Sequence, residues 1–170
     1  IRGACFDWIR WSELLRTTTV SINIIVMAVF SCLPLQAQLS GAYTINPTQS
    51  AGSRNYQNWA SAIGDLLSGS RTDGGSTQGP GISSSVTFTV FDTVYNAVSI
   101  DFTAVSGAMP SRRITFQSAS NNSKRCVLKY ASSSSNTSDF VMNVDGVDYV
   151  TFKGIGFERT GTAAYATVVQ

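Results

Sequence analysis

The sequence Val86-Thr-Phe-Thr-Val-Phe91 opens a region in which short apolar or alternating runs are separated by polar breaks. Similar runs follow at residues 97–102, 113–117, 126–130, 140–144, 149–152, 155–157 and 166–169. The runs place β-branched and aromatic residues at alternating positions, which is typical of half-buried β-strands. The breaks are clusters of Ser, Asn and Gly, which favour turns. The region from residue 86 to residue 170 is therefore predicted to be all-β.

Two arrangements accommodate short strands that are separated by turns. One is an antiparallel β-sandwich, and the other is a right-handed parallel β-helix whose rungs each hold two or three short strands. The periodicity alone does not choose between them. Very short strands and an amphipathic helix upstream favour the β-helix, because a helix placed there covers the open first rung and prevents edge pairing. The sandwich remains the alternative.

Residues 38–85, upstream of these strands, are predicted to hold a strand (39–46), a capping helix (56–67) and a Gly/Ser-rich exposed loop or flexible insertion (68–85). In the helix, Tyr56, Trp59 and Ile63 fall on one face at helical spacing. Gly69 is a stop signal for that helix. The predicted organisation is therefore an N-terminal strand and helix followed by the first rungs of a β-helix over residues 86–170.

Residues 16–37 are predicted to be a secretory signal peptide, because Arg16 precedes an apolar run and the small residue Ala37 follows a proline break. The apolar run, residues 20–35, is shorter than the roughly 20 residues of a membrane-spanning helix. An uncleaved anchor and lipid attachment at Cys32 are the less favoured alternatives. Residues 1–15 are interpreted as upstream read-through or a mis-assigned start, and the chain as a fragment. The signal predicts secretion or display on the outer cell surface.

The composition after cleavage excludes several classes of function. Residues 38–170 hold nine Lys/Arg and eight Asp/Glu, a net charge of +1, so no basic patch indicates nucleic acid. The chain has no His, which excludes His-containing triads and removes a common metal ligand. Cys126 is the only cysteine that survives cleavage, so no intramolecular disulfide forms. Cys126 lies in a strand pattern and is predicted to be a small buried apolar residue rather than a reactive thiol.

The order of these segments carries a resemblance to a known group of proteins. Leu39-Ser-Gly-Ala-Tyr-Thr-Ile-Asn-Pro47 follows the signal directly, the helix 56–67 comes next, and Val144-Asp-Gly-Val-Asp-Tyr-Val-Thr-Phe-Lys-Gly-Ile-Gly-Phe157 is the most characteristic segment. Residues 39–170 thereby resemble the N-terminal part of bacterial secreted proteins with right-handed parallel β-helix repeats, the pectin-lyase-like architecture. Asp92-Thr-Val-Tyr-Asn96 stands where that group has a Gly-x-Tyr turn, but it lacks the glycine. The resemblance implies a fold, export and downstream domains of the same chain, not an activity.

The best-defined turn signal is Asp145-Gly146, between two apolar runs. Asp145 and Asp148 are two carboxylates three residues apart and are the calcium candidates of this chain, because calcium prefers oxygen ligands. No full calcium-loop motif accompanies them, so the turn interpretation is favoured. No catalytic residue and no other cofactor or metal site is predicted.

Other charged residues are dispersed along the sequence. The separate carboxylates are Asp92, Asp101 and Glu158, and the basic residues next to strands are Arg112, Arg113, Lys129 and Lys153. A glycosidase needs two carboxylates across the sugar bond. The resemblance implies that a lyase of this fold uses calcium and a basic residue. Nothing in the sequence pairs these groups, so exposed charges beside strands are the favoured interpretation.

The function expected from the sequence is that of a non-catalytic binding or adhesion scaffold, secreted or on the cell surface. Its expected partner is an extracellular polysaccharide or a cell-surface ligand, with no nucleic acid and with membrane contact only through the transient signal peptide. Two alternatives stay open. One is a polysaccharide lyase or glycoside hydrolase whose active rungs lie beyond residue 170. The other is a structural domain of a larger exoprotein.

Overall fold

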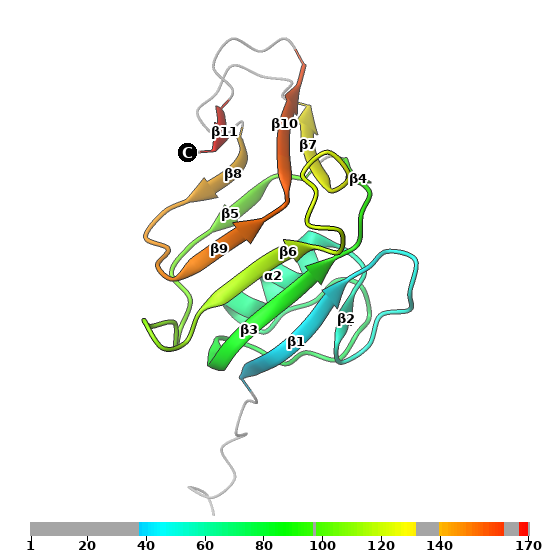
Figure 1. Ribbon diagram of the computed structural model, residues 1–170. Helices are drawn as coiled ribbons and strands as arrows, with labels where there is room; N and C mark the ends of the chain where they lie inside the picture. Colours follow the sequence, from blue (N-terminus) through cyan, green and yellow to red (C-terminus); the bar gives the residue numbers. More distant parts are fainter. Residues whose placement is uncertain (1–37, 97, 132–139, 162–166, 170) are drawn as a thin grey trace, which may run out of the picture. The chain divides into compact units, whose positions relative to one another are not determined.

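The computed structural model describes residues 38–96, 98–131, 140–161 and 167–169, and this part of the chain is mostly β, as predicted (Figure 1). Its strands are β1 (Leu39–Ile45), β2 (Asn55–Tyr56), β3 (Ile82–Val90), β4 (Val94–Tyr95), β5 (Ile100–Phe102), β6 (Ile114–Ser118), β7 (Val127–Ala131), β8 (Phe140–Val144), β9 (Val150–Lys153), β10 (Gly156–Thr160) and β11 (Thr167–Val169), and its helix is α2 (Trp59–Ser68). The predicted signal peptide lies outside these residues. Within them, no helix has the length and apolar character needed to cross a membrane.

The strands form three sheets, and every ladder between the named strands is parallel. The first sheet has the order β2-β1-β3-β6-β9, the second β10-β7-β4 and the third β11-β8-β5. From β3 onward, the chain passes through the three sheets in the same order three times. The antiparallel sandwich is therefore wrong for this part of the chain, because sandwich strands pair antiparallel.

The core of the first sheet is a stack of aromatic rings. Tyr43, Phe88, Phe116 and Phe152 are register partners on β1, β3, β6 and β9. The ring centroids of Phe88 and Phe116 are 4.7 Å apart, and those of Phe116 and Phe152 are 5.3 Å apart, with nearly parallel planes. Neighbouring strands lie about 4.8 Å apart, so in-register pairing places like side chains directly over one another. The rings therefore form one continuous column, in which Tyr43, Phe88 and Phe116 are buried and Phe152 is half-buried.

The opposite face of the first sheet carries polar side chains at the alternate positions. Thr87, Thr115 and Thr151 are register partners there, and all three are half-buried. Threonine suits such positions because its β-branched side chain packs well on a pleated surface. The predicted alternation is confirmed in residues 86–90 of β3 and in β6, where buried residues alternate with half-buried ones.

Helix α2 begins three residues later than predicted and ends one residue later, at the predicted stop signal Gly69. Tyr56 belongs to β2, where it pairs with Ile45. Asn58 caps the helix, and its side-chain oxygen accepts a hydrogen bond from the Ser61 N–H at 2.8 Å. At the other end, Gly69 has a φ of +66°, the left-handed conformation that ends many helices. The helix contacts β1, β2 and β5, and Trp59 packs its ring 5.2 Å from Phe116, so α2 lies on the inner side of the first sheet (Figure 1).

The Gly/Ser-rich stretch 68–85 differs from the predicted exposed loop at both ends. Ser68 completes α2, and β3 already begins at Ile82. Between them, the loop is attached to the buried carboxylate of Asp65, which accepts hydrogen bonds from the backbone N–H groups of Gln78 and Gly79 at 2.8–3.0 Å. The carboxylate satisfies backbone donors that no strand or helix pairs. The loop therefore keeps exposed residues, as predicted, at positions 70, 72, 74, 76 and 77, but its end is anchored to α2.

A buried ion pair between Arg71 and Asp73 stabilises the first part of the same loop. The Arg71 Nη2 and Asp73 Oδ2 atoms are 2.9 Å apart, and each side chain is only 1% exposed. Arg71 also donates to the backbone carbonyls of Gly52 and Asn55 at 2.7 Å. Its guanidinium lies 4.0 Å from the centroid of the Tyr56 ring. A buried pair with this many hydrogen bonds is the kind whose disruption is costly.

The Asp73 carboxyl makes the free energy of unfolding depend on pH. Burial raises the pKa of Asp73, but hydrogen bonds from Arg71 and from the N–H groups of Gln57 and Gly75 outweigh it and lower the pKa from 3.8 to about 2. A group whose pKa is lower in the folded state than in the unfolded state stabilises the folded state at pH values above its unfolded pKa. This stabilisation is lost as the pH falls through the folded pKa. We expect a loss on the order of 2 kcal/mol from this group between about pH 4 and about pH 2.

Urea denaturation from pH 7 to pH 2 measures this dependence in the wild type and in Asp73→Asn. The variant should be less stable at neutral pH, and most of the difference should be gone at pH 2, because Asp73 is then about half protonated in the folded wild type and almost fully protonated in the unfolded chain. An acid loss of equal size in both proteins would show that other carboxyl groups produce it.

Candidate functional site

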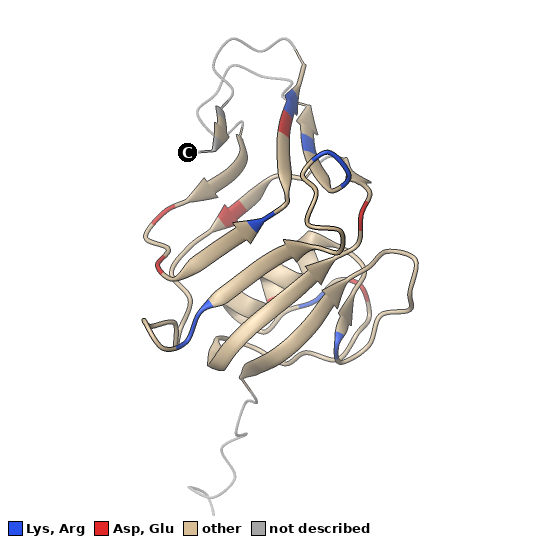
Figure 2. Ribbon diagram, viewed as in Figure 1, with Lys and Arg blue, Asp and Glu red and all other residues tan. Residues whose placement is uncertain are grey.

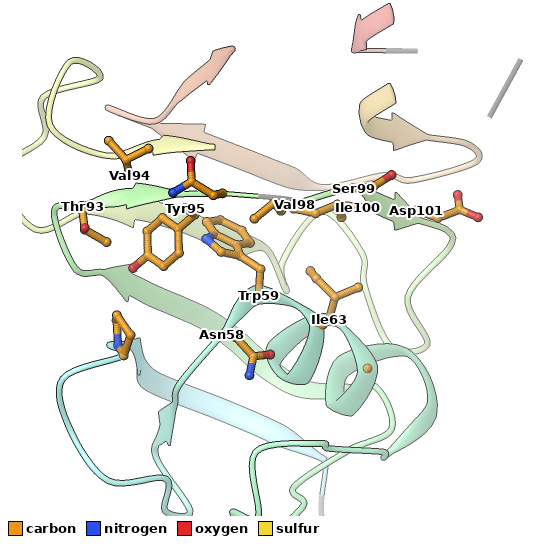
Figure 3. A pocket seen from close by; sticks show the side chains of 14 residues that line it. Asn58, Trp59, Ile63, Thr93, Val94, Tyr95, Val98, Ser99, Ile100 and Asp101 are labelled. Carbon is orange, nitrogen blue, oxygen red and sulfur yellow. The ribbon is translucent and has the colours of Figure 1, made fainter. Parts of the chain in front are cut away.

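A cavity of about 600 Å³ lies between α2 and the strands β4 and β5, and we call it the α2 groove (Figure 3). Among its lining residues are Asn58, Trp59 and Ile63 from the helix region, and Tyr95, Asn96, Val98, Ser99, Ile100 and Asp101 from the chain around β4 and β5. Both strands are edge strands of their sheets, so the groove runs along a sheet edge that no strand of the described residues covers. Its volume falls within the range of ligand-binding pockets.

The floor of the groove is apolar, with one buried donor. Trp59 is 2% exposed and meets Tyr95 edge to face, with ring centroids 6.2 Å apart. Figure 3 shows Trp59 extending from α2 toward Tyr95 and Val98. The Trp59 Nε1 atom is buried and has no hydrogen-bond partner among the described residues. Buried N–H groups are nearly always paired, so an unpaired one at the wall of a cavity requires an explanation.

Tyr95 is held in place by the backbone and is not available for acid–base chemistry. Its hydroxyl lies 3.0 Å from the carbonyl oxygen of Phe91 and 3.2 Å from that of Ile45, and it donates its hydrogen to this pair. Burial raises the pKa of Tyr95 well above its usual value. The phenol therefore stays protonated and joins the turn before β4 to β1.

The rim of the groove carries amide, hydroxyl and carboxylate groups from Asn58, Asn96, Ser99 and Asp101. Asp101 is exposed, and it is the only charged residue among those that line the groove. Its Oδ1 atom accepts a hydrogen bond of 2.9 Å from the Asn143 side chain, which lies beside it in the register of β5 and β8. This bond fixes the direction of the carboxylate. The lining thus combines an apolar floor with uncharged polar groups and one oriented carboxylate.

The two calcium candidates lie in the turn between β8 and β9. Asp145 and Asp148 are both exposed, and the turn uses positive φ angles of +66° at Gly146 and +61° at Tyr149. Within the residues that the structure describes, no three His, Cys, Asp or Glu side chains are placed to hold a metal together. The positive φ angles agree with the turn interpretation of this sequence, and calcium binding stays a prediction.

The remaining charged candidates do not meet at one place, and Figure 2 shows charged residues dispersed over several strands and loops. Lys129 pairs with Glu158 at 2.9 Å across β7 and β10. Asp92 lies 3.8 Å from Arg125. Arg113 donates to the backbone of Pro110, and the structure gives Arg112 a backbone bridge to Met109. Asp101 stands on β5 in the third sheet and Glu158 on β10 in the second.

The buried position predicted for Cys126 is confirmed, because the side chain has no exposed surface and forms no disulfide. Burial raises the pKa of this thiol to about 12, so it stays protonated at neutral pH. The cysteine therefore acts as a small core residue beside Tyr95.

The α2 groove itself was not predicted from the sequence. Trp59 and Asp101 were both noted, one as a core residue and the other as a separate carboxylate. Only the parallel pairing of β5 with β8 and the position of α2 place them along the same cavity. Comparison with known proteins adds no family to this geometry: a scan against protein-family models, a search of curated proteins and a search of solved structures gave no match.

Proposed function

We propose that this protein is a secreted or cell-surface scaffold that binds extracellular polysaccharide without cleaving it, and that its sheets are the first rungs of a right-handed parallel β-helix. The repeated passage of the chain through three parallel sheets supports this fold, because each rung of a β-helix contributes one strand to each sheet. Stacked aromatic partners at Phe88, Phe116 and Phe152 also suit a repeating core.

The end of the stack away from β2 supports the same fold. The strands β9, β10 and β11 are each the edge strand of their sheet. A cavity of about 260 Å³ there is lined by Met142, Val144, Val147, Val150, Phe152 and Phe157. Apolar side chains beside strand edges that pair with no other strand of the described residues are the kind of surface that another rung would cover.

The observation that carries the binding role is the α2 groove. Its apolar floor and its rim of Asn, Ser and Asp side chains match the general composition of ligand pockets, in which a few polar groups fix the orientation of the ligand. We assign binding rather than bond cleavage because hydrolysis of a glycoside uses two carboxyl groups. The described lining offers Asp101 alone.

Binding to a panel of polysaccharides tests this function. The protein is incubated with cellulose, chitin, starch and polygalacturonate, and both the bound fraction and the release of reducing or unsaturated sugar ends are measured. We expect retention on at least one polysaccharide and no released ends. Released ends would overturn the non-catalytic assignment, and a failure to bind any of the four would overturn polysaccharide binding.

A further inference from the structure

We propose that Arg54 binds the carboxylate of a uronate sugar, in a cavity separate from the α2 groove. This inference rests on the proposed polysaccharide binding and adds a second site and a class of sugar. It follows from the orientation of the Arg54 guanidinium, from the donors that this group leaves open, and from the polar side chains beside it.

A cavity of about 290 Å³ lies where β2 pairs with β1 at the edge of the first sheet, and we call it the Arg54 cavity. Among its lining residues are Tyr43, Thr44, Gln49, Arg54, Asn55 and Thr89. Arg54 is the only charged residue in the lining, so the cavity attracts anions. Its volume is close to the lower end of the range for ligand pockets, which suits a single sugar ring.

The protein holds the guanidinium of Arg54 in one orientation. Its Nη1 atom donates to the backbone carbonyls of Ser40 and Ala42 on β1. These carbonyls are available because β2 pairs only with the last two residues of β1. The Cζ atom of Arg54 also lies 4.6 Å from the centroid of the Tyr43 ring, as in a cation–π contact. A guanidinium that is already oriented loses less conformational freedom when a ligand binds.

The other two nitrogens of the guanidinium, Nε and Nη2, have no hydrogen-bond partner among the described residues. No carboxylate of these residues lies within ion-pair distance of Arg54. The N–H groups of Nε and Nη2 point to the same side of the guanidinium plane, so together they match the two oxygens of one carboxylate. Arg54 is exposed, so a ligand can reach this pair of donors.

Arg71 shows within the same protein what such a pair of donors binds. Its Nε and Nη2 atoms donate to the Asp73 carboxylate at 3.0 and 2.9 Å, and its Nη1 atom donates to backbone carbonyls. Its guanidinium lies 4.0 Å from the centroid of the Tyr56 ring. Arg54 has the same backbone contacts and the same contact with a tyrosine ring, but no described residue supplies the carboxylate. The missing partner is therefore a carboxylate that a ligand brings.

The side chains beside Arg54 favour a carboxylate with hydroxyl groups next to it. The Thr89 hydroxyl and the Gln49 amide line the cavity, and neither has a hydrogen-bond partner among the described residues. Thr44 and Asn55 bind each other instead, with a distance of 2.6 Å between Oγ1 and Oδ1. A uronate ring carries hydroxyls close to its carboxylate, and a hydroxyl or an amide can both donate to them and accept from them. The carboxylate of an acidic peptide has no such hydroxyls, so the lining favours the uronate.

Titration with soluble oligomers, followed by calorimetry at low and at high salt, tests the Arg54 cavity. Hexagalacturonate is the acidic sugar, cellohexaose is the neutral sugar, and hexaglutamate is a peptide with carboxylates but no hydroxyls. We expect hexagalacturonate to bind most tightly and to bind more weakly at high salt, because salt screens the charge of an exposed arginine. Arg54→Gln should weaken this binding by about tenfold or more, and Thr89→Val by about fivefold.

The control Arg113→Gln removes the same charge from an exposed arginine outside the cavity and should bind like the wild type. Arg54→Gln also removes the hydrogen bonds to β1, so urea denaturation measures its stability first. Thr89→Val and Gln49→Ala leave these bonds in place. If Arg54→Gln is unfolded, the two variants decide the outcome, because both should weaken the binding of hexagalacturonate.

The outcomes separate this inference from the function on which it rests. If the variants in the cavity bind hexagalacturonate like the wild type, the sugar binds elsewhere, so the site is wrong while polysaccharide binding stands. The same holds if hexagalacturonate does not bind but one of the four polysaccharides is retained. Equal or tighter binding of cellohexaose or hexaglutamate would overturn the uronate as the ligand. If none of the probes and none of the four polysaccharides binds, the proposed function is overturned together with the site.

Discussion

Replacing Phe116 by alanine is expected to lower the free energy of unfolding by about 3–5 kcal/mol. Phe116 is fully buried, and its ring centroid lies 4.7 Å from that of Phe88, 5.2 Å from Trp59 and 5.3 Å from Phe152. The side chain therefore joins α2 to three strands of the first sheet. Because ladders on both sides fix the position of β6, the neighbouring rings cannot move in to fill the cavity. Urea denaturation followed by circular dichroism measures the loss.

Phe91→Ala is the matched control for this substitution. Phe91 is 39% exposed and follows β3, so removing the same ring there should cost less than about 1 kcal/mol. Phe116→Leu keeps most of the buried volume and should fall between the two variants. If Phe116→Ala lost no more stability than Phe91→Ala, the aromatic column would not be the core that organises the sheets.

The positions of the longer strands could be predicted because each has one buried face. In β6, Ile114 and Phe116 are buried and alternate with half-buried Thr115 and Gln117, and this period of two is visible in the sequence. For β8, the predicted bounds, residues 140–144, agree with the structure. The two-residue strands β2 and β4 could not be found in this way, because two residues show no period. Val94 and Tyr95 of β4 were instead assigned to a turn.

The alternation of apolar and polar residues does not show which strands pair with one another. Phe88, Phe116 and Phe152 stack because the register of β3, β6 and β9 brings them together, yet unequal lengths of chain separate them. Alternation assigns a side chain to a face of a sheet but does not name the strand beside it. The upstream helix and the shortness of the strands favoured the parallel arrangement, and the parallel ladders agree with it.

The loop before β3 shows a second limit of sequence reasoning. Residues 68–85 are rich in Gly and Ser, which predicted an exposed segment. Many of these residues are exposed, but nothing in the sequence indicated that the carboxylate of Asp65 anchors the loop by pairing with two of its backbone N–H groups. Gly79 is needed at this point, since a Cβ atom there would lie 1.7 Å from the Asp65 carbonyl oxygen. No periodic signal links an aspartate on a helix to a glycine 14 residues later.

The α2 groove escaped prediction for a similar reason. Trp59 belongs to a helix face and Asp101 to a short strand, and neither position has a motif that marks a binding site. Their relation depends on how α2 lies against the edge strands β4 and β5. Whether the Trp59 indole N–H has a hydrogen-bond partner depends on how the side chains pack. Neither the composition of the chain nor the spacing of its residues predicts it.

The second large effect is expected from Asp65→Ala, which should lower the free energy of unfolding by about 3 kcal/mol or more. Asp65 has no exposed surface, and it accepts hydrogen bonds from the Tyr56 hydroxyl at 2.7 Å and from the Gln78 and Gly79 N–H groups. Alanine leaves all three donors without this acceptor. Urea denaturation measures the loss, and faster proteolysis within residues 70–81 should accompany it, because the loop loses its attachment to α2.

Two further variants separate the attachment of the loop from the contact with Tyr56. Asp145→Ala removes an exposed aspartate and should change stability by less than about 0.5 kcal/mol. Tyr56→Phe removes only the hydroxyl, and a double-mutant cycle with Asp65→Ala isolates the coupling between the two side chains. Burial, followed by the hydrogen bond to Asp65, raises the pKa of Tyr56 well above its usual value, so the hydroxyl stays a donor at neutral pH. If Asp65→Ala were as stable as Asp145→Ala, backbone contacts alone would hold the loop, and the carboxylate would not be the group that anchors its end to α2.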